Sequence, residues 1–265
     1  MNQPVMIEIN PDNPKPPLTD AARADVAALA ARQRRANGLL MKVVNFAGGQ
    51  VEDGLKLLPK AMRGQVEAAV KSALLRAYDV ASRSRKLSIV RSDRAHRIIG
   101  TLSGALGGIG GLPTALAELP VATMLIFRAV QGVAVQYGED PLSEATRIEC
   151  LRVFGAGGPG GADDGIDSGF IGARLSITGP AIGKIIAKVA PRFGAVLSQK
   201  LLTQAVPIIG AAAGAGTNYA FVDYYIEMAH VHFGLRKVAR DHGAAAVADV
   251  FHRALAEARL PKARG

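Results

Sequence analysis

The sequence predicts an all-α protein that folds as a single compact helical domain. Apolar residues recur at the i, i+3, i+4 spacing of a buried helix face, for example at Val66, Val70 and Leu74. Residues that commonly cap helices precede several of these stretches. No stretch shows the sustained apolar–polar alternation of a half-buried strand. Aromatic residues make up 5% of the chain and there is no Trp, so the core is built mainly from small aliphatic side chains.

The N-terminal part of the chain combines a tail and a first long helix. Residues 1–18 are rich in proline, have the composition of a disordered tail and lack the apolar region of a signal peptide. A helical domain is expected from 19 to 265. Its first helix starts at Thr19 or Asp20, either of which can cap it, and ends at the glycine pair 48–49. Leu29 is expected on its buried side.

A second long helix, expected over 63–85, leads into a strongly basic segment. Six positive side chains of this segment are candidates for contact with an anionic membrane: Arg83, Arg85, Lys86, Arg91, Arg94 and Arg97. The formal net charge of +10 favours anionic partners. Aromatic side chains do not interleave with the basic clusters, so nucleic acid is unlikely as a partner and ranks behind lipid.

Two apolar, glycine-rich runs occupy 98–127 and 201–222, and within them 98–117 and 201–222 are long enough to span a bilayer. Both place glycines four residues apart, and prolines, including Pro120, interrupt them. Because glycine and proline weaken a membrane span, buried helices or a membrane-dipping hairpin are favoured over true spans. The predicted fold therefore has two Gly-rich apolar helical hairpins at its centre and amphipathic helices around them.

The first apolar run contains one charged residue, Glu118. A carboxylate among apolar neighbours needs a partner or a proton. The glycine stripes of the two runs would let them cross closely and bring Glu118 toward Asn218. We therefore expect Glu118 to be buried and to pair with Asn218 or with an arginine, for which Arg128 and Arg174 are candidates.

A shorter helix is expected over 139–154, with Asp140 as its cap and Pro141 at its first position. Cys150 within it is expected to be a small core residue rather than a nucleophile. A flexible Gly-rich loop, 155–169, follows. It contains the pattern G-x-G-x-x-G, but after a helical pattern instead of a strand, so no dinucleotide site is predicted.

The C-terminal half is also helical in pattern. Lys184 and Lys188 accompany isoleucines on a short amphipathic helix that Pro191 is expected to end. Such a helix either lies on an anionic membrane or has an ordinary solvated face. Glu227 and His230 fit a Glu-x-x-His pair, but the second copy that a di-iron site needs is lacking. No metal site or cofactor is predicted.

Much of the chain, roughly 59–243, resembles the EcsC protein family. The stretches that carry the resemblance are ELP at 118–120, FRAVQGVAVQYGED at 127–140, the helix with Glu149, GFIGAR at 169–174 and, most specifically, QAVPIIGAAAGAGTN at 204–218. The family more often has Tyr where this chain has Phe170. The resemblance implies a bacterial, all-helical protein, named for a gene neighbour of an ABC transporter involved in secretion. It implies no reaction.

The resemblance also marks positions on this chain. They are Glu118, Pro120, Arg128, Tyr137, Gly138, Glu149, Arg174, Gln204, Pro207, Gly210, Gly214, Asn218, His232 and Arg236. A set of this kind forms either a buried polar network that fixes helix register or a ligand pocket. The site candidates are Glu118, Arg128, Glu149, Arg174, Asn218 and His232.

Two functions from different classes follow from these observations. The first is a non-enzymatic cytoplasmic protein, peripheral to the inner membrane, that binds anionic lipid or assists an envelope or transport complex. The second is a soluble pocket protein or enzyme that acts on an apolar small molecule, with Glu118 as acid or base. A carboxylate in an apolar site can have a raised pKa and so exchange protons near neutral pH.

Overall fold

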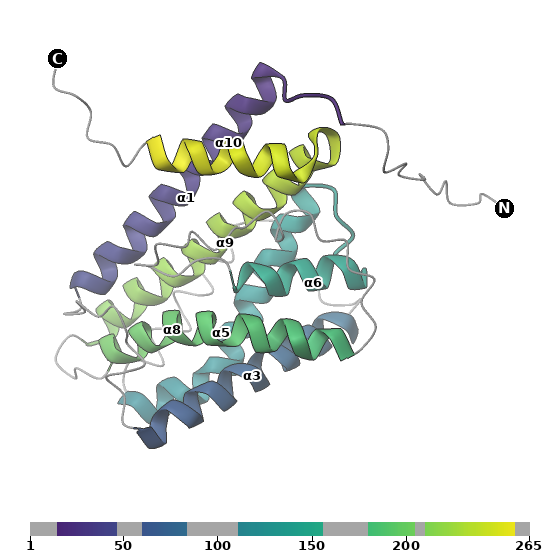
Figure 1. The fold of residues 1–265 in the computed structure, drawn as a ribbon. Helices are drawn as coiled ribbons and strands as arrows, with labels where there is room; N and C mark the ends of the chain where they lie inside the picture. Colours follow the sequence, from purple (N-terminus) through teal and green to yellow (C-terminus); the bar gives the residue numbers. More distant parts are fainter. Residues whose placement is uncertain (1–14, 47–59, 84–110, 156–179, 205–209, 258–265) are drawn as a thin grey trace, which may run out of the picture.

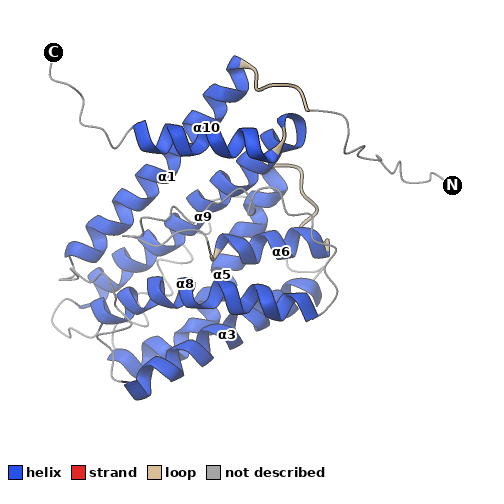
Figure 2. Ribbon diagram, viewed as in Figure 1, coloured by secondary structure: helices blue, strands red, loops and turns tan. Residues whose placement is uncertain are grey.

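The computed structural model describes residues 15–46, 60–83, 111–155, 180–204 and 210–257. Within these ranges the chain forms seven α-helices and no strand, which confirms the all-α prediction (Figure 2). The helices are α1 (Asp20–Phe46), α3 (Lys60–Arg83), α5 (Gly111–Gln136), α6 (Glu144–Val153), α8 (Pro180–Gln204), α9 (Gly210–His242) and α10 (Ala244–Glu257).

The longest helix, α9, lies between two groups of helices (Figure 1). On one side it packs along α1, and α10 folds back to pack on α1 and α9. On the other side it packs on α5, and α3 and α8 pack together with α5. The short helix α6 contacts α3, α5, α8 and α9. Charged residues on opposite sides of α9 therefore meet different neighbours.

The core between these helices is apolar and includes a group of stacked rings. Phe154 packs on Phe127, Phe193 and Tyr225, with ring centroids 6.1, 4.9 and 5.2 Å away respectively. Burying rings of this size is among the largest favourable contributions to folding. Cys150 lies in the same core, fully buried, as predicted. Burial raises the pKa of its thiol, so this cysteine is unreactive.

Helix α1 begins as the sequence predicts. The Thr19 hydroxyl accepts a hydrogen bond from the backbone N–H of Ala22 at 3.1 Å, which caps the first turn. The buried face runs through Ala22, Val26 and Ala30, whose small side chains let the helix lie close to its neighbours. Leu29, expected on that face, is half-buried at its edge.

Two prolines predicted to interrupt helices lie inside them instead. Helix α5 continues through Pro120, and α8 continues through Pro191. In α8, Pro191 cannot bond the carbonyl of Ala187, but both residues lie on the exposed face where water can bond that carbonyl. The buried residues Val189 and Phe193 hold the helix against the core on either side of the proline. Tertiary packing therefore outweighs the tendency of proline to interrupt a helix.

The start of α6 also differs from the prediction. The cap is Ser143, whose Oγ accepts from the Thr146 N–H at 3.2 Å, and not Asp140. Asp140 forms the preceding turn, in which its carboxylate accepts from the Leu142 N–H at 3.0 Å. Both residues are good caps. The helix starts at Glu144 because Pro141 and Leu142 are used in that turn.

The end of α5 positions the carboxylate of Glu139. Gly138 has φ +79°, a conformation that glycine adopts without steric cost. The Glu139 N–H bonds the Ala134 carbonyl at 3.1 Å, and the Gly138 N–H bonds the Val135 carbonyl at 3.0 Å. These two bonds form a Schellman cap. The cap turns the chain so that Glu139 faces the C-terminal part of α9, where it meets two arginines.

One described helix segment, Leu119–Gln136 in α5, is long and apolar enough to cross a membrane. Its mean hydropathy is 1.4, and 61% of it is buried inside the protein. Core helices of helical bundles meet the same criteria, so this segment alone does not argue for insertion. Of the two Gly-rich runs, 98–110 and 205–209 lie outside the described residues, so the predicted hairpins are not tested.

Candidate functional site

Glu149 is the centre of a buried ionic network between α6 and α9. Its Oε2 lies 2.8 Å from Nε2 of His232. Its Oε1 lies 3.0 Å from a guanidinium nitrogen of Arg152 and 3.0 Å from one of Arg236. Glu149, Arg152 and His232 are all buried. Arg152 is one helical turn from Glu149 on α6, whereas His232 and Arg236 are one turn apart on α9, so the carboxylate joins the two helices.

The surroundings of Glu149 keep its carboxyl group ionised. Burial alone would raise the pKa of Glu149, because it disfavours the charged form. The hydrogen bond with His232 and the charges of His232, Arg236 and Arg152 outweigh burial, and the pKa lies below its ordinary value. A carboxylate held in this way is a poor proton donor near neutral pH. The network is therefore suited to linking α6 and α9, and it is not suited to general acid catalysis.

Alternating charges extend the network toward the protein surface. Glu139 lies 3.9 Å from Nε of Arg236 and accepts from Arg240 at 2.8 Å. Arg240 also donates to the carbonyl of Tyr137 at 3.4 Å. Three arginines of α6 and α9 thus share two carboxylates. The end of α5 is held to the last turns of α9 by these contacts.

The structure brings together two of the six predicted site residues, Glu149 and His232. Arg128 has other contacts: it donates to Oε1 of Gln131 at 3.2 Å and to the carbonyl of Val80 at 3.5 Å. Burial lowers the pKa of the Arg128 guanidinium. Arg174 lies outside the described residues, and the side chains of Glu118 and Asn218 are not described, so their predicted pairing is not tested.

The predicted membrane contacts are described only in part. Lys184 and Lys188 are exposed on α8, and the neighbouring Ile182 and Ile185 are half-buried. Arg83 is the last residue of α3, but its side chain is not described. The other five lie outside the described residues: Arg85, Lys86, Arg91, Arg94 and Arg97.

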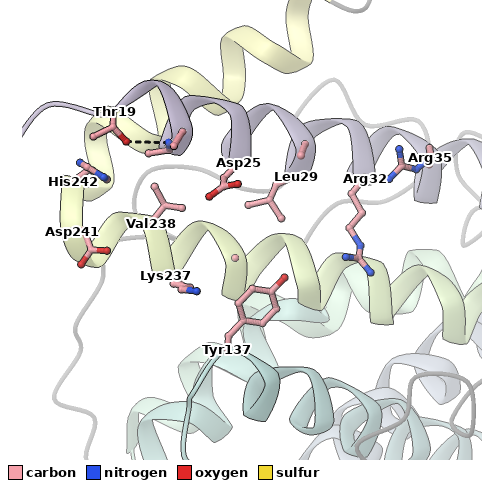
Figure 3. A pocket seen from close by; sticks show the side chains of 14 residues that line it. Thr19, Asp25, Leu29, Arg32, Arg35, Tyr137, Lys237, Val238, Asp241 and His242 are labelled. Carbon is pink, nitrogen blue, oxygen red and sulfur yellow. Dashed lines mark hydrogen bonds between the residues drawn. The ribbon is translucent and has the colours of Figure 1, made fainter.

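An open groove lies between α1 and the C-terminal half of α9, with a volume of about 560 Å³. That volume lies within the usual range of small-molecule sites. Figure 3 shows Asp25 and Leu29 pointing from α1 toward α9. The lining residues are Thr19, Ala21, Ala22, Asp25, Ala28, Leu29, Arg32, Arg35, Tyr137, Gly234, Lys237, Val238, Asp241 and His242.

Contacts along the groove show that α1 and α9 run antiparallel. Arg32 of α1 forms a bidentate ion pair with Glu227 of α9. At the other end, the His242 ring nitrogen Nδ1 lies 3.2 Å from the carbonyl of Pro16. Between them, Gly234 lets the helices approach closely, because a Cβ at this position would stand 2.8 Å from Leu29 Cδ2. The floor of the groove is therefore narrow and apolar.

The residues of the Glu-x-x-His pattern have separate partners. Glu227 is bound to Arg32, and His230 Nδ1 lies 3.3 Å from the Tyr137 hydroxyl. His232 faces Glu149, so the two histidines point to different neighbours. Among the described residues, no group of three or more His, Cys, Asp or Glu side chains is placed to hold a metal ion.

The groove residues were not predicted as a site from the sequence. Asp25, Arg32 and Lys237 are isolated charges on amphipathic helices, a pattern typical of a solvated face. Only the antiparallel packing of α1 on α9, across about 200 residues of sequence, brings them together. Tyr137 is the one groove residue that the family resemblance marked.

Comparison with known proteins identifies the family. The model of the EcsC protein family matches residues 27–163 and 176–238, which include Glu149, His232 and most of the groove. No curated protein and no solved structure matches the chain. With a match over most of its length, the chain belongs to the EcsC protein family.

Proposed function

We propose that this protein is a non-enzymatic, peripheral membrane protein that binds anionic lipid on the cytoplasmic side of the inner membrane. The observation that carries the proposal is the joint occurrence of exposed apolar and basic side chains on α3, α5 and α8. Leu75 and Val80 on α3 and Val121 on α5 are 44%, 37% and 56% exposed. Lys184 and Lys188 are exposed on α8, which packs on α3 and α5.

Exposed apolar side chains and exposed lysines each have a known effect at a membrane. Exposed apolar side chains gain free energy by entering the interfacial region. Lysines near an anionic leaflet contribute about 1 kcal/mol each at low ionic strength. The basic segment 83–97 begins where α3 ends and adds further positive charge to the chain. The proposal includes the two central Gly-rich hairpins, as apolar elements that dip into the bilayer, and assistance to an envelope or transport complex.

Vesicle flotation tests the proposal. The full chain should float with vesicles that contain phosphatidylglycerol, and the bound fraction should fall as salt is raised from about 0.05 to 0.5 M, because screening weakens surface attraction. Reversing two charges with Lys184→Glu and Lys188→Glu should lower the bound fraction severalfold. Arg253→Glu on α10 reverses an exposed charge away from this surface and should leave binding close to that of the wild type. Equal recovery with neutral and anionic vesicles would contradict the proposal.

The groove between α1 and α9 favours a second candidate function, a soluble protein that holds an apolar or amphipathic small molecule. Its volume of about 560 Å³ suits such a molecule, and its floor is apolar. The enzymatic alternative predicted from the sequence would use Glu118 as acid or base, and Glu118 is not among the described residues that line this groove. Native mass spectrometry of the purified protein tests it: a small molecule that co-purifies supports the candidate, and an unliganded chain counts against it.

A further inference from the structure

The groove between α1 and α9 contains charged groups that the protein itself leaves without partners. Asp25 on α1 and Lys237 and Asp241 on α9 line it. Among the described residues, none of the three has a hydrogen-bond or ion-pair partner. This contrasts with Arg32 at the same groove, which is paired with Glu227. Unpaired charges of both signs on one concave surface are complementary to a ligand that carries both signs.

The arrangement of these charges narrows the class of ligand. Lys237 and Asp241 are four residues apart on α9, so their side chains emerge about 6 Å apart along one face. Asp25 approaches from α1 on the opposite side of the groove (Figure 3). Two carboxylates and one ammonium group therefore line this end of the groove. Although the whole chain has a net charge of +10, this end of the groove favours a ligand with a positive group.

We propose that the groove binds the zwitterionic headgroup of an ethanolamine phospholipid. The ammonium of the headgroup lies between Asp25 and Asp241, and its phosphate bonds Lys237. The short two-carbon spacer of ethanolamine matches a separation of one helical turn between acid and base. The lipid as the source of this headgroup rests on the proposed membrane association.

The apolar floor supplies the rest of the site. Beyond the charged end, the groove is lined by Ala28, Leu29 and Val238. The first carbons of an acyl chain would lie on these side chains and remove apolar surface from water. The groove is open, so the remainder of each chain can stay in the bilayer. A site of this kind binds the headgroup and the first carbons of the acyl chains while the lipid stays in the bilayer.

Calorimetric titration with short-chain lipids below their micelle concentration tests the proposal without any bilayer. The probes are dihexanoyl phosphatidylethanolamine, dihexanoyl phosphatidylglycerol, phosphoethanolamine and ethanolamine. The ethanolamine lipid should bind at least roughly tenfold more tightly than each of the other three, since each lacks the ammonium, the chains or the phosphate. The protein can bind the short-chain lipid without floating with vesicles, and it can float with vesicles without binding the short-chain lipid. The two experiments therefore test the two proposals independently.

Matched variants assign the binding to the groove. Asp25→Asn should weaken binding of the ethanolamine lipid by roughly tenfold, and so should Lys237→Gln, because each removes one charge-assisted contact. Asp249→Asn and Arg253→Gln remove one charge of each sign at exposed positions outside the groove and should bind as the wild type does. All four residues are exposed, so thermal melting should confirm folded variants. Equal affinity for the glycerol and ethanolamine lipids, or wild-type affinity of Asp25→Asn, would overturn the proposal.

Discussion

Helix α9 carries charged side chains toward α6 and toward α1. Those that face α6 are paired with a buried carboxylate, whereas those that face α1 are exposed. Toward α6, His232 and Arg236 meet Glu149 at 2.8 and 3.0 Å in a buried setting. Toward α1, Lys237 and Asp241 line an open groove without partners among the described residues. The charges of the buried side are paired within the protein, whereas those of the open side remain exposed and available to the ligand that we propose.

The physical reason lies in desolvation. An ionised group taken out of water costs several kcal/mol unless partners replace the lost hydration. Glu149, at 4% exposure, can remain ionised only because three basic side chains surround it. Exposed groups such as Lys237 keep their hydration and need no partner. Substitutions on the two sides of α9 should therefore have very different effects on stability.

The largest effect is expected at Glu149. Replacing it by Ala leaves Arg152, Arg236 and His232 without the carboxylate that they share, and should lower the free energy of unfolding by about 3 to 5 kcal/mol. Urea denaturation followed by circular dichroism at neutral pH measures the loss. Glu67→Ala is the control, because Glu67 pairs with Lys71 at 3.3 Å on the surface and the pair is worth at most about 0.5 kcal/mol. Equal losses in the two variants would mean that Glu149 is not buried.

An intermediate effect is expected from pH. The pKa of Glu149 is lower in the folded protein than its ordinary value, so ionised Glu149 stabilises the fold. This stabilisation is complete above the unfolded pKa of about 4.3 and is lost as the pH falls through the folded pKa. The difference in unfolding free energy between the wild type and Glu149→Gln should therefore narrow below about pH 4.3. Urea titrations over a series of pH values check this, and a difference that grows toward acid would contradict it.

The same contrast explains how much could be predicted from the sequence. Helix positions follow from periodicity, and the family resemblance marked Glu149 and His232. Their contact could not be predicted, because they are 83 residues apart and only the packing of α6 on α9 joins them. The start of α6 was misplaced because Asp140 and Ser143 are equally good caps, and the turn at Pro141 decides between them. The groove had almost no signal, because exposed charges on two helices look the same whether or not those helices meet.

The smallest effect on stability is expected at Lys237. Its side chain is exposed and has no partner among the described residues, so Lys237→Ala removes no contact that holds α1 on α9. Surface changes of this kind usually alter the free energy of unfolding by less than about 0.5 kcal/mol. Alanine is also a good helix former, so α9 itself is not weakened. The comparison of the two sides of α9 therefore predicts that Lys237→Ala unfolds at the urea concentration of the wild type.

Arg32→Ala is the internal standard for this prediction. Arg32 lies at the same groove but is paired with Glu227, so its replacement should lower the urea concentration at which the protein unfolds. If Lys237→Ala lowers the free energy of unfolding as much as Arg32→Ala does, then Lys237 helps to hold α1 on α9. The charges that line the groove would then stabilise the fold, and they would not be available to a ligand.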